Sequence, residues 1–151
     1  MPVLIVLLTV FAVTTGISKI FLGDWQFILN GNIAMFFMLC FTALGHFKFA
    51  SGMEKMLPRF LPMKKEIVLL TGVFEILAGI ALLFPNLRHI AGILLIIFFI
   101  LILPANIKAA IDHLDYQKGT FDGKGTSYLW FRVPLQIFLI LWVWYFAVNG
   151  F

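Results

Sequence analysis

The residue best suited to chemistry in this sequence is Glu75, which lies in the otherwise apolar stretch Thr71–Gly79. A charged side chain at the centre of a lipid bilayer costs about 2.5–3.5 kcal/mol even on lenient insertion scales, so an embedded acid is a candidate functional group. Three roles are open to Glu75: binding a ligand or cofactor, transferring a proton, or pairing with Arg132 or His46 to hold helices together.

Several other polar side chains lie in apolar segments at similar depths. Counting about 1.5 Å per residue from one end of each expected helix places Glu75 and Gln136 about 12 Å deep, with Asn106, Arg132 and His46 at shallower levels. Thr71 and Glu75 are four residues apart and share a helix face, as do Arg132 and Gln136. We therefore predict one polar cavity or hydrogen-bond network, built from the residues Glu75, His46, Asn106, Gln136, Arg132 and Thr71.

The sequence contains no recognisable catalytic or metal-binding constellation. Cys40 is the only cysteine, so an internal disulfide or a paired-thiol redox site is impossible. Of the three histidines only His46 is embedded, which disfavours haem held by two histidines, and no Cys and His cluster suits zinc. We predict no catalytic residues, no metal site and no evident cofactor, with a quinone as the one candidate.

Composition indicates that these residues lie in a membrane. Of 151 residues, 62% are hydrophobic and 12% are charged, and the mean hydropathy is +1.05. Soluble domains carry about 25% charged residues, so too little polar surface is available to cover a water-soluble globule. The net charge of +4 does not indicate nucleic-acid binding, because the basic residues flank apolar segments.

The expected fold is a single all-α domain, a polytopic transmembrane bundle of four to five helices, with five preferred. Lipid requires backbone groups to be satisfied within each segment, and no period-two alternation suggests barrel strands. A span needs about 20 residues. The predicted spans are Val3–Leu22, Leu29–Phe47, Ile67–Phe84, Ile90–Ala110 and Tyr128–Val148. The alternative for the first is a cleaved signal peptide, although it lacks a preceding basic residue and a clear cleavage site.

Basic residues predict the orientation of this bundle. One side carries nine of them, and the other only Lys19 and Arg88. The nine are Lys48, Lys55, Arg59, Lys64, Lys65, Lys108, Lys118, Lys124 and Arg132. The positive-inside rule then predicts a multi-pass protein of the inner (cytoplasmic) membrane, with a cytoplasmic amino terminus and an external carboxyl terminus. The segment 51–65 mixes apolar and basic residues and is predicted to lie in the headgroup layer.

Six short motifs, in order, resemble the DoxX family of small membrane proteins. They are Gly45-His46-Phe47, Met56–Pro62, Thr71-Gly72-x-x-Glu75-x-x-x-Gly79, Pro104-Ala105-Asn106-Ile107, Arg132-x-Pro134-Leu135-Gln136 and Trp142-x-Trp144. The resemblance implies a compact helical bundle that shares His46, Glu75, Asn106 and Gln136. It also implies an association with membrane oxidoreductase complexes. The chemistry of thiol-redox relatives does not carry over, because Cys40 has no partner.

These observations favour an accessory membrane protein that binds a quinone, a lipid or another small molecule within a larger complex. The partners we expect are the lipid bilayer and either other membrane subunits or a second copy of the chain. An enzyme acting on its own is not expected, because the side chains compose no active site. The alternatives are a proton-coupled transporter that uses Glu75, or a membrane chaperone or cargo-type protein without a ligand.

Overall fold

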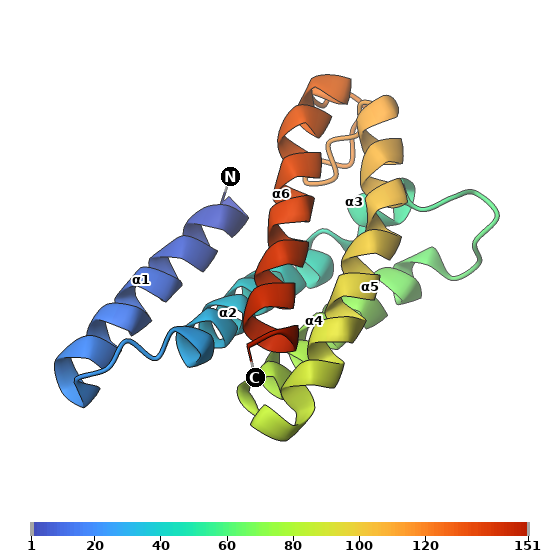
Figure 1. Ribbon diagram of the computed structural model, residues 1–151. Coiled ribbons are helices and arrows are strands. Elements are labelled where there is room, and N and C mark those ends of the chain that lie inside the picture. Colours follow the sequence, from blue (N-terminus) through green and yellow to red (C-terminus); the bar gives the residue numbers. More distant parts are fainter. Residues whose placement is uncertain (1, 151) are drawn as a thin grey trace.

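The computed structural model describes residues 2–150 and consists of α-helices joined by short connections (Figure 1). Five of its elements are long and apolar enough to cross a membrane. They are α1 (Pro2–Leu22), α2 (Phe27–Lys48), α4 (Lys64–Leu83), α5 (Pro85–Ile111), and α6 (Leu129–Val143), which is preceded by the 3-10 turn η2 (Gly125–Tyr128) and continued by the π turn η3 (Trp144–Val148). The prediction of an all-α bundle with five spans is confirmed, and the chain is a multi-pass membrane protein.

The helix boundaries lie close to the predicted spans except at the start of α5. The predicted spans left residues 85–89 as a connection, whereas α5 begins at Pro85 and follows α4 after Phe84 alone. Proline fits the first position of a helix, where its missing N–H leaves no hydrogen bond unmade. The Arg88 side chain also donates from Nε to the carbonyl of Leu82 at 2.9 Å, which satisfies one of the open carbonyls at the end of α4.

The connection between α2 and α4 is helical only in its first part. Helix α3 (Ala50–Met53) is followed by the 3-10 turn η1 (Glu54–Met56), and residues 57–63 have no regular structure. Pro58 and Pro62 explain the break, since each removes a backbone donor. Beyond the turn, the Phe60 side chain is 83% exposed. An exposed apolar ring beside basic residues, in the connection between α2 and α4, is typical of a segment at a membrane surface.

The core forms where α2, α4, α5 and α6 meet. Fully buried side chains there include Met35, Leu39, Leu82, Leu95 and Val143. Helix α1 packs chiefly along α2 and stands apart from α4 and α5 (Figure 1). The outward faces of the helices carry exposed aliphatic and aromatic residues, as expected of surfaces that contact lipid chains.

Hydrogen bonds join α2 to α6 and η3 at one end of the bundle. The Asn32 amide donates to the carbonyls of Ile28 at 2.7 Å and Phe146 at 2.8 Å, and the Trp142 indole donates to the carbonyl of Gly31 at 3.1 Å. The opposite end, where α2 ends and α4 begins, carries most of the basic residues and is called the basic end below. The predicted site residues lie between these two ends of the bundle.

Candidate functional site

A cavity of about 410 Å³ lies inside the bundle toward the basic end. Its walls come from the first turn of α1, the second half of α2, α3 and η1, the middle of α4, the second half of α5, helix α6, and the loop that follows α5. Polar side chains contributed by the helices are Thr42, His46, Lys48, Glu75, Asn106, Arg132 and Gln136. Apolar residues complete the lining, among them Val3, Met38, Phe41, Leu44, Phe99, Ile102 and Leu139.

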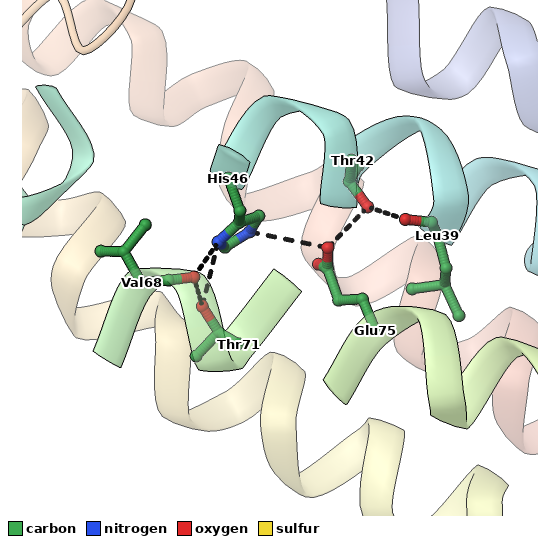
Figure 2. A network of polar contacts seen from close by, with 6 residues as sticks. All are labelled: Leu39, Thr42, His46, Val68, Thr71 and Glu75. Atoms are coloured by element: carbon green, nitrogen blue, oxygen red, sulfur yellow. Dashed lines mark hydrogen bonds and ion pairs between the residues drawn. The ribbon is translucent and has the colours of Figure 1, made fainter. Parts of the chain in front are cut away.

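Glu75 is the acidic residue of this cavity and is almost fully buried, with 3% of its surface exposed. The Thr42 hydroxyl lies 3.0 Å from Glu75 Oε2, and His46 Nε2 lies 3.6 Å from the same oxygen. Both partners belong to α2, whereas Glu75 belongs to α4 (Figure 2). The carboxyl group therefore joins these two helices as well as facing the cavity.

The opposite edge of the His46 ring, at Nδ1, contacts residues in the first turns of α4. Nδ1 lies 2.9 Å from the Thr71 hydroxyl and 3.2 Å from the carbonyl of Val68, and Thr71 lies 2.7 Å from that same carbonyl (Figure 2). Gly72 permits this approach, because a Cβ at that position would lie 2.9 Å from His46 Cβ. The absence of a side chain at Gly72 thus leaves room for His46 beside α4.

The hydrogen bonds of Thr42, Glu75 and His46 are compatible with two arrangements of protons. The Thr42 hydroxyl has a single proton, yet it lies 3.0 Å from both the Leu39 carbonyl and Glu75 Oε2. When Thr42 donates to Leu39, Glu75 must donate to Thr42 and is a carboxylic acid. When Thr42 donates to Glu75, a carboxylate is satisfied, and a protonated His46 faces it with opposite charge. One proton can occupy either residue without breaking the network.

The α5 and α6 side of the cavity is organised differently. The Gln136 side chain is 2% exposed, and its amide donates to the carbonyl of Phe99 at 2.8 Å, across from α6 to α5. Asn106 lines the same cavity from α5. Arg132 lies one turn before Gln136 on α6, and its Nε is buried without a hydrogen-bond partner among the described residues.

A loop and the short helix α3 close the cavity at the basic end. Tyr116 and Gln117 of the loop 112–124 contribute to the lining. The Tyr116 ring packs edge-on against Phe49 with centroids 6.3 Å apart, and Gly52 of α3 lies directly beneath the Tyr116 carbonyl. Lys55 also donates to the carbonyl of Gly119 at 2.6 Å. Burial raises the pKa of the Tyr116 phenol, so this group stays neutral.

The structure brings five of the six predicted site residues to one cavity. His46, Glu75, Asn106, Arg132 and Gln136 all line it, while Thr71 joins the network through the His46 ring. Their role in binding stays a prediction. Thr42 was missed, although it lies four residues before His46 on the same helix face, a spacing that identifies it. Tyr116 and Gln117 carry no comparable signal, because a loop has no periodicity to predict its direction.

Comparison with known proteins identifies a family but no activity. Residues 35–147 match the family described as Domain of unknown function (DUF8561). No curated protein and no solved structure gives a significant match. The matched segment runs from α2 to the end of the bundle and includes every helical polar residue of the cavity. Because the match covers well over half of the chain, this protein belongs to the DUF8561 family.

Proposed function

We propose that this protein binds a lipophilic small molecule, a quinone or a lipid, in the cavity between its helices. The observation that carries the proposal is the mixed lining of this cavity, in which the polar side chains Glu75, His46 and Arg132 accompany many Phe, Leu and Met side chains. Its volume of about 410 Å³ lies within the range of about 300–1,000 Å³ usual for small-molecule sites. An amphiphilic molecule is the natural complement of such a space.

The location of the cavity within the membrane follows from the basic residues. Lys48, Lys55, Lys108 and other basic side chains gather at the basic end, which the positive-inside rule assigns to the cytoplasm. Pro2 and Val3 line the cavity at this end, which favours a cytoplasmic amino terminus and an external carboxyl terminus. In a bacterial cell this topology corresponds to the inner membrane, with the cavity in its cytoplasmic half.

The physiological role we propose is that of an accessory component of a membrane complex. The resemblance of the motifs around His46, Glu75 and Gln136 to the DoxX family supports an oxidoreductase complex in particular. Other membrane subunits or a second copy of the chain would be its partners. In this role the protein supplies a binding site, and the electron-transfer chemistry resides in another subunit.

Native mass spectrometry of the protein in lipid nanodiscs tests this function, with Glu75→Ala beside the wild type. We expect a stoichiometric small molecule on the wild type and its loss from the variant. Glu66→Ala is the matched control, because Glu66 is exposed in the first turn of the same helix. Equal retention of the molecule by wild type and a well-folded Glu75→Ala variant would contradict the proposed site.

Proton-coupled transport is the second candidate, and the two proton arrangements of Glu75 and His46 favour it. A carrier needs a group that gains and loses a proton while it faces the substrate, and this pair lines the cavity. The expected result is pH-dependent uptake of a solute into proteoliposomes that Glu75→Gln abolishes. Uptake that is unchanged in Glu75→Gln would argue against this candidate.

A further inference from the structure

Building on the proposed function, we infer that the ligand is an amphiphile whose head is an oxyanion, a carboxylate or a phosphate, and that Arg132 binds this head. The inference identifies the chemical class that the cavity selects. It rests on three features: the unmet hydrogen bond of Arg132, the balance of charge in the lining, and the place where the cavity meets the lipid-facing surface.

Arg132 offers a donor that the protein itself does not use. Its Nε is buried and has no partner among the described residues, and none of the ion pairs within 4.0 Å in residues 2–150 involves it. Its side chain lines the cavity. A guanidinium is always charged and presents N–H groups in a planar fork that matches two oxygens of a carboxylate or phosphate. An oxyanion in the cavity would supply the missing acceptor.

The lining of the cavity carries more basic than acidic side chains. Glu75 is the one acidic residue of the lining, and its carboxyl group is engaged by Thr42 and His46 on α2. Lys48 adds a second basic side chain, so two basic residues face one acidic residue. Because the buried Nε of Arg132 lacks an acceptor and basic side chains outnumber acidic ones, an anionic head suits this lining better than a neutral one.

The cavity reaches the lipid-facing surface beside α1 and α2. Phe41 and Leu44 line it and are 40% and 65% exposed, and Pro2 and Val3 of α1 line the same side. In a membrane-spanning helix such exposed apolar residues face lipid chains. A molecule with its head at Arg132 would therefore extend an apolar tail toward the bilayer, which selects an amphiphile and not a small water-soluble anion.

The test uses probes with one tail and different heads: hexadecanoic acid, hexadecyl phosphate and hexadecanol. Each is titrated into the full-length protein in phosphatidylcholine nanodiscs, and bound probe is counted by native mass spectrometry. We expect the acid or the phosphate to bind about tenfold more tightly than the alcohol, as a charge-assisted hydrogen bond predicts. The stronger of the two anionic probes identifies the head as carboxylate or phosphate.

Variants at Arg132 connect this preference to the guanidinium. Arg132→Gln should remove the preference for anionic heads, and Arg132→Lys should retain part of it, since the charge stays and the planar fork is lost. Arg59→Gln is the control, because Arg59 is an exposed basic residue at the same end of the bundle that does not line the cavity. If Arg132→Gln does not fold, the lysine variant and the probe series on the wild type still decide.

The possible failures are distinguishable. Hexadecanol or a decyl-ubiquinone that binds as tightly as the anionic probes would overturn the oxyanion inference and leave the proposed small-molecule site intact. An anionic preference that persists in Arg132→Gln would overturn the role of Arg132. Failure of every probe to bind the folded wild type, the quinone included, would overturn both the inference and the proposed function.

Discussion

His46 Nε2 lies 3.6 Å from Glu75 Oε2, and this contact links two polar pairs, each of which is formed between α2 and α4. On one side Glu75 meets the Thr42 hydroxyl of α2, and on the other His46 meets Thr71 of α4. The Glu75 carboxyl group thus has protein partners, while Arg132 Nε has no hydrogen-bond partner among the described residues. Arg132 Nε is therefore a donor of this cluster that stays open to a ligand.

Removing the Thr42 hydroxyl should weaken the bundle by a small, measurable amount. Thr42→Val keeps the shape of the side chain but deprives Glu75 of its 3.0 Å partner. Polar contacts between membrane helices average about 0.6 kcal/mol and reach about 1.7 kcal/mol, so we expect a loss of about 1 kcal/mol in the free energy of unfolding. Equilibrium unfolding in mixed micelles measures it. Thr42→Ser retains the hydroxyl and should stay near the wild type; an equal loss in both variants would contradict the role of the hydrogen bond.

Gly72→Ala should be destabilising because of the close approach of α2 and α4. The new Cβ would lie 2.9 Å from His46 Cβ, an atom fixed to the backbone that cannot swing aside. Overpacking of this kind costs about 1–3 kcal/mol. Thermal unfolding in detergent should show a lower midpoint than for Gly16→Ala, the control, since nothing lies within 4 Å of the corresponding Cβ on α1. A Gly72→Ala protein as stable as this control would show that the helices are not so closely packed there.

Gly52→Ala should loosen the loop that closes the basic end of the cavity. The added Cβ would clash with the Tyr116 carbonyl oxygen, so α3 or the loop must shift. Trypsin cleavage after Lys118 reports on this loop, and we expect faster cleavage in the variant. Gly45→Ala serves as the control, because its nearest neighbour would be Met53 Cε at 3.8 Å. Equal cleavage rates in the two variants would count against contact between α3 and the loop.

Stability should fall at alkaline pH because of Tyr116. Burial raises the pKa of this phenol above its ordinary value of about 10. A raised pKa in the folded state means that folding favours the neutral form, so the contribution is complete below pH about 10 and declines as pH rises through the folded-state pKa. The difference between ultraviolet titrations of wild type and Tyr116→Phe isolates this residue from Tyr128 and Tyr145. A Tyr116 that ionises at or below the ordinary pKa would refute its burial.

The sequence by itself determined which segments cross the membrane and which residues are out of place in them. Both properties are local: a helix of about 20 apolar residues spans lipid whatever its neighbours are, and a carboxyl at position 75 is anomalous in any arrangement of the bundle. The shared helix face of Arg132 and Gln136 was equally predictable, since it depends only on helical periodicity.

Only the tertiary structure decided which of these faces meet. From the sequence, Glu75 could pair with Arg132 or with His46. Because α2 packs against α4 at Gly72, Glu75 contacts His46 and Thr42. Thr71 bonds to His46 rather than facing the cavity itself, and Arg132 is left without a partner at Nε. The physical reason is that periodicity fixes the direction of a side chain around its own helix. The rotation and approach of one helix against another depend on contacts between residues far apart in the chain.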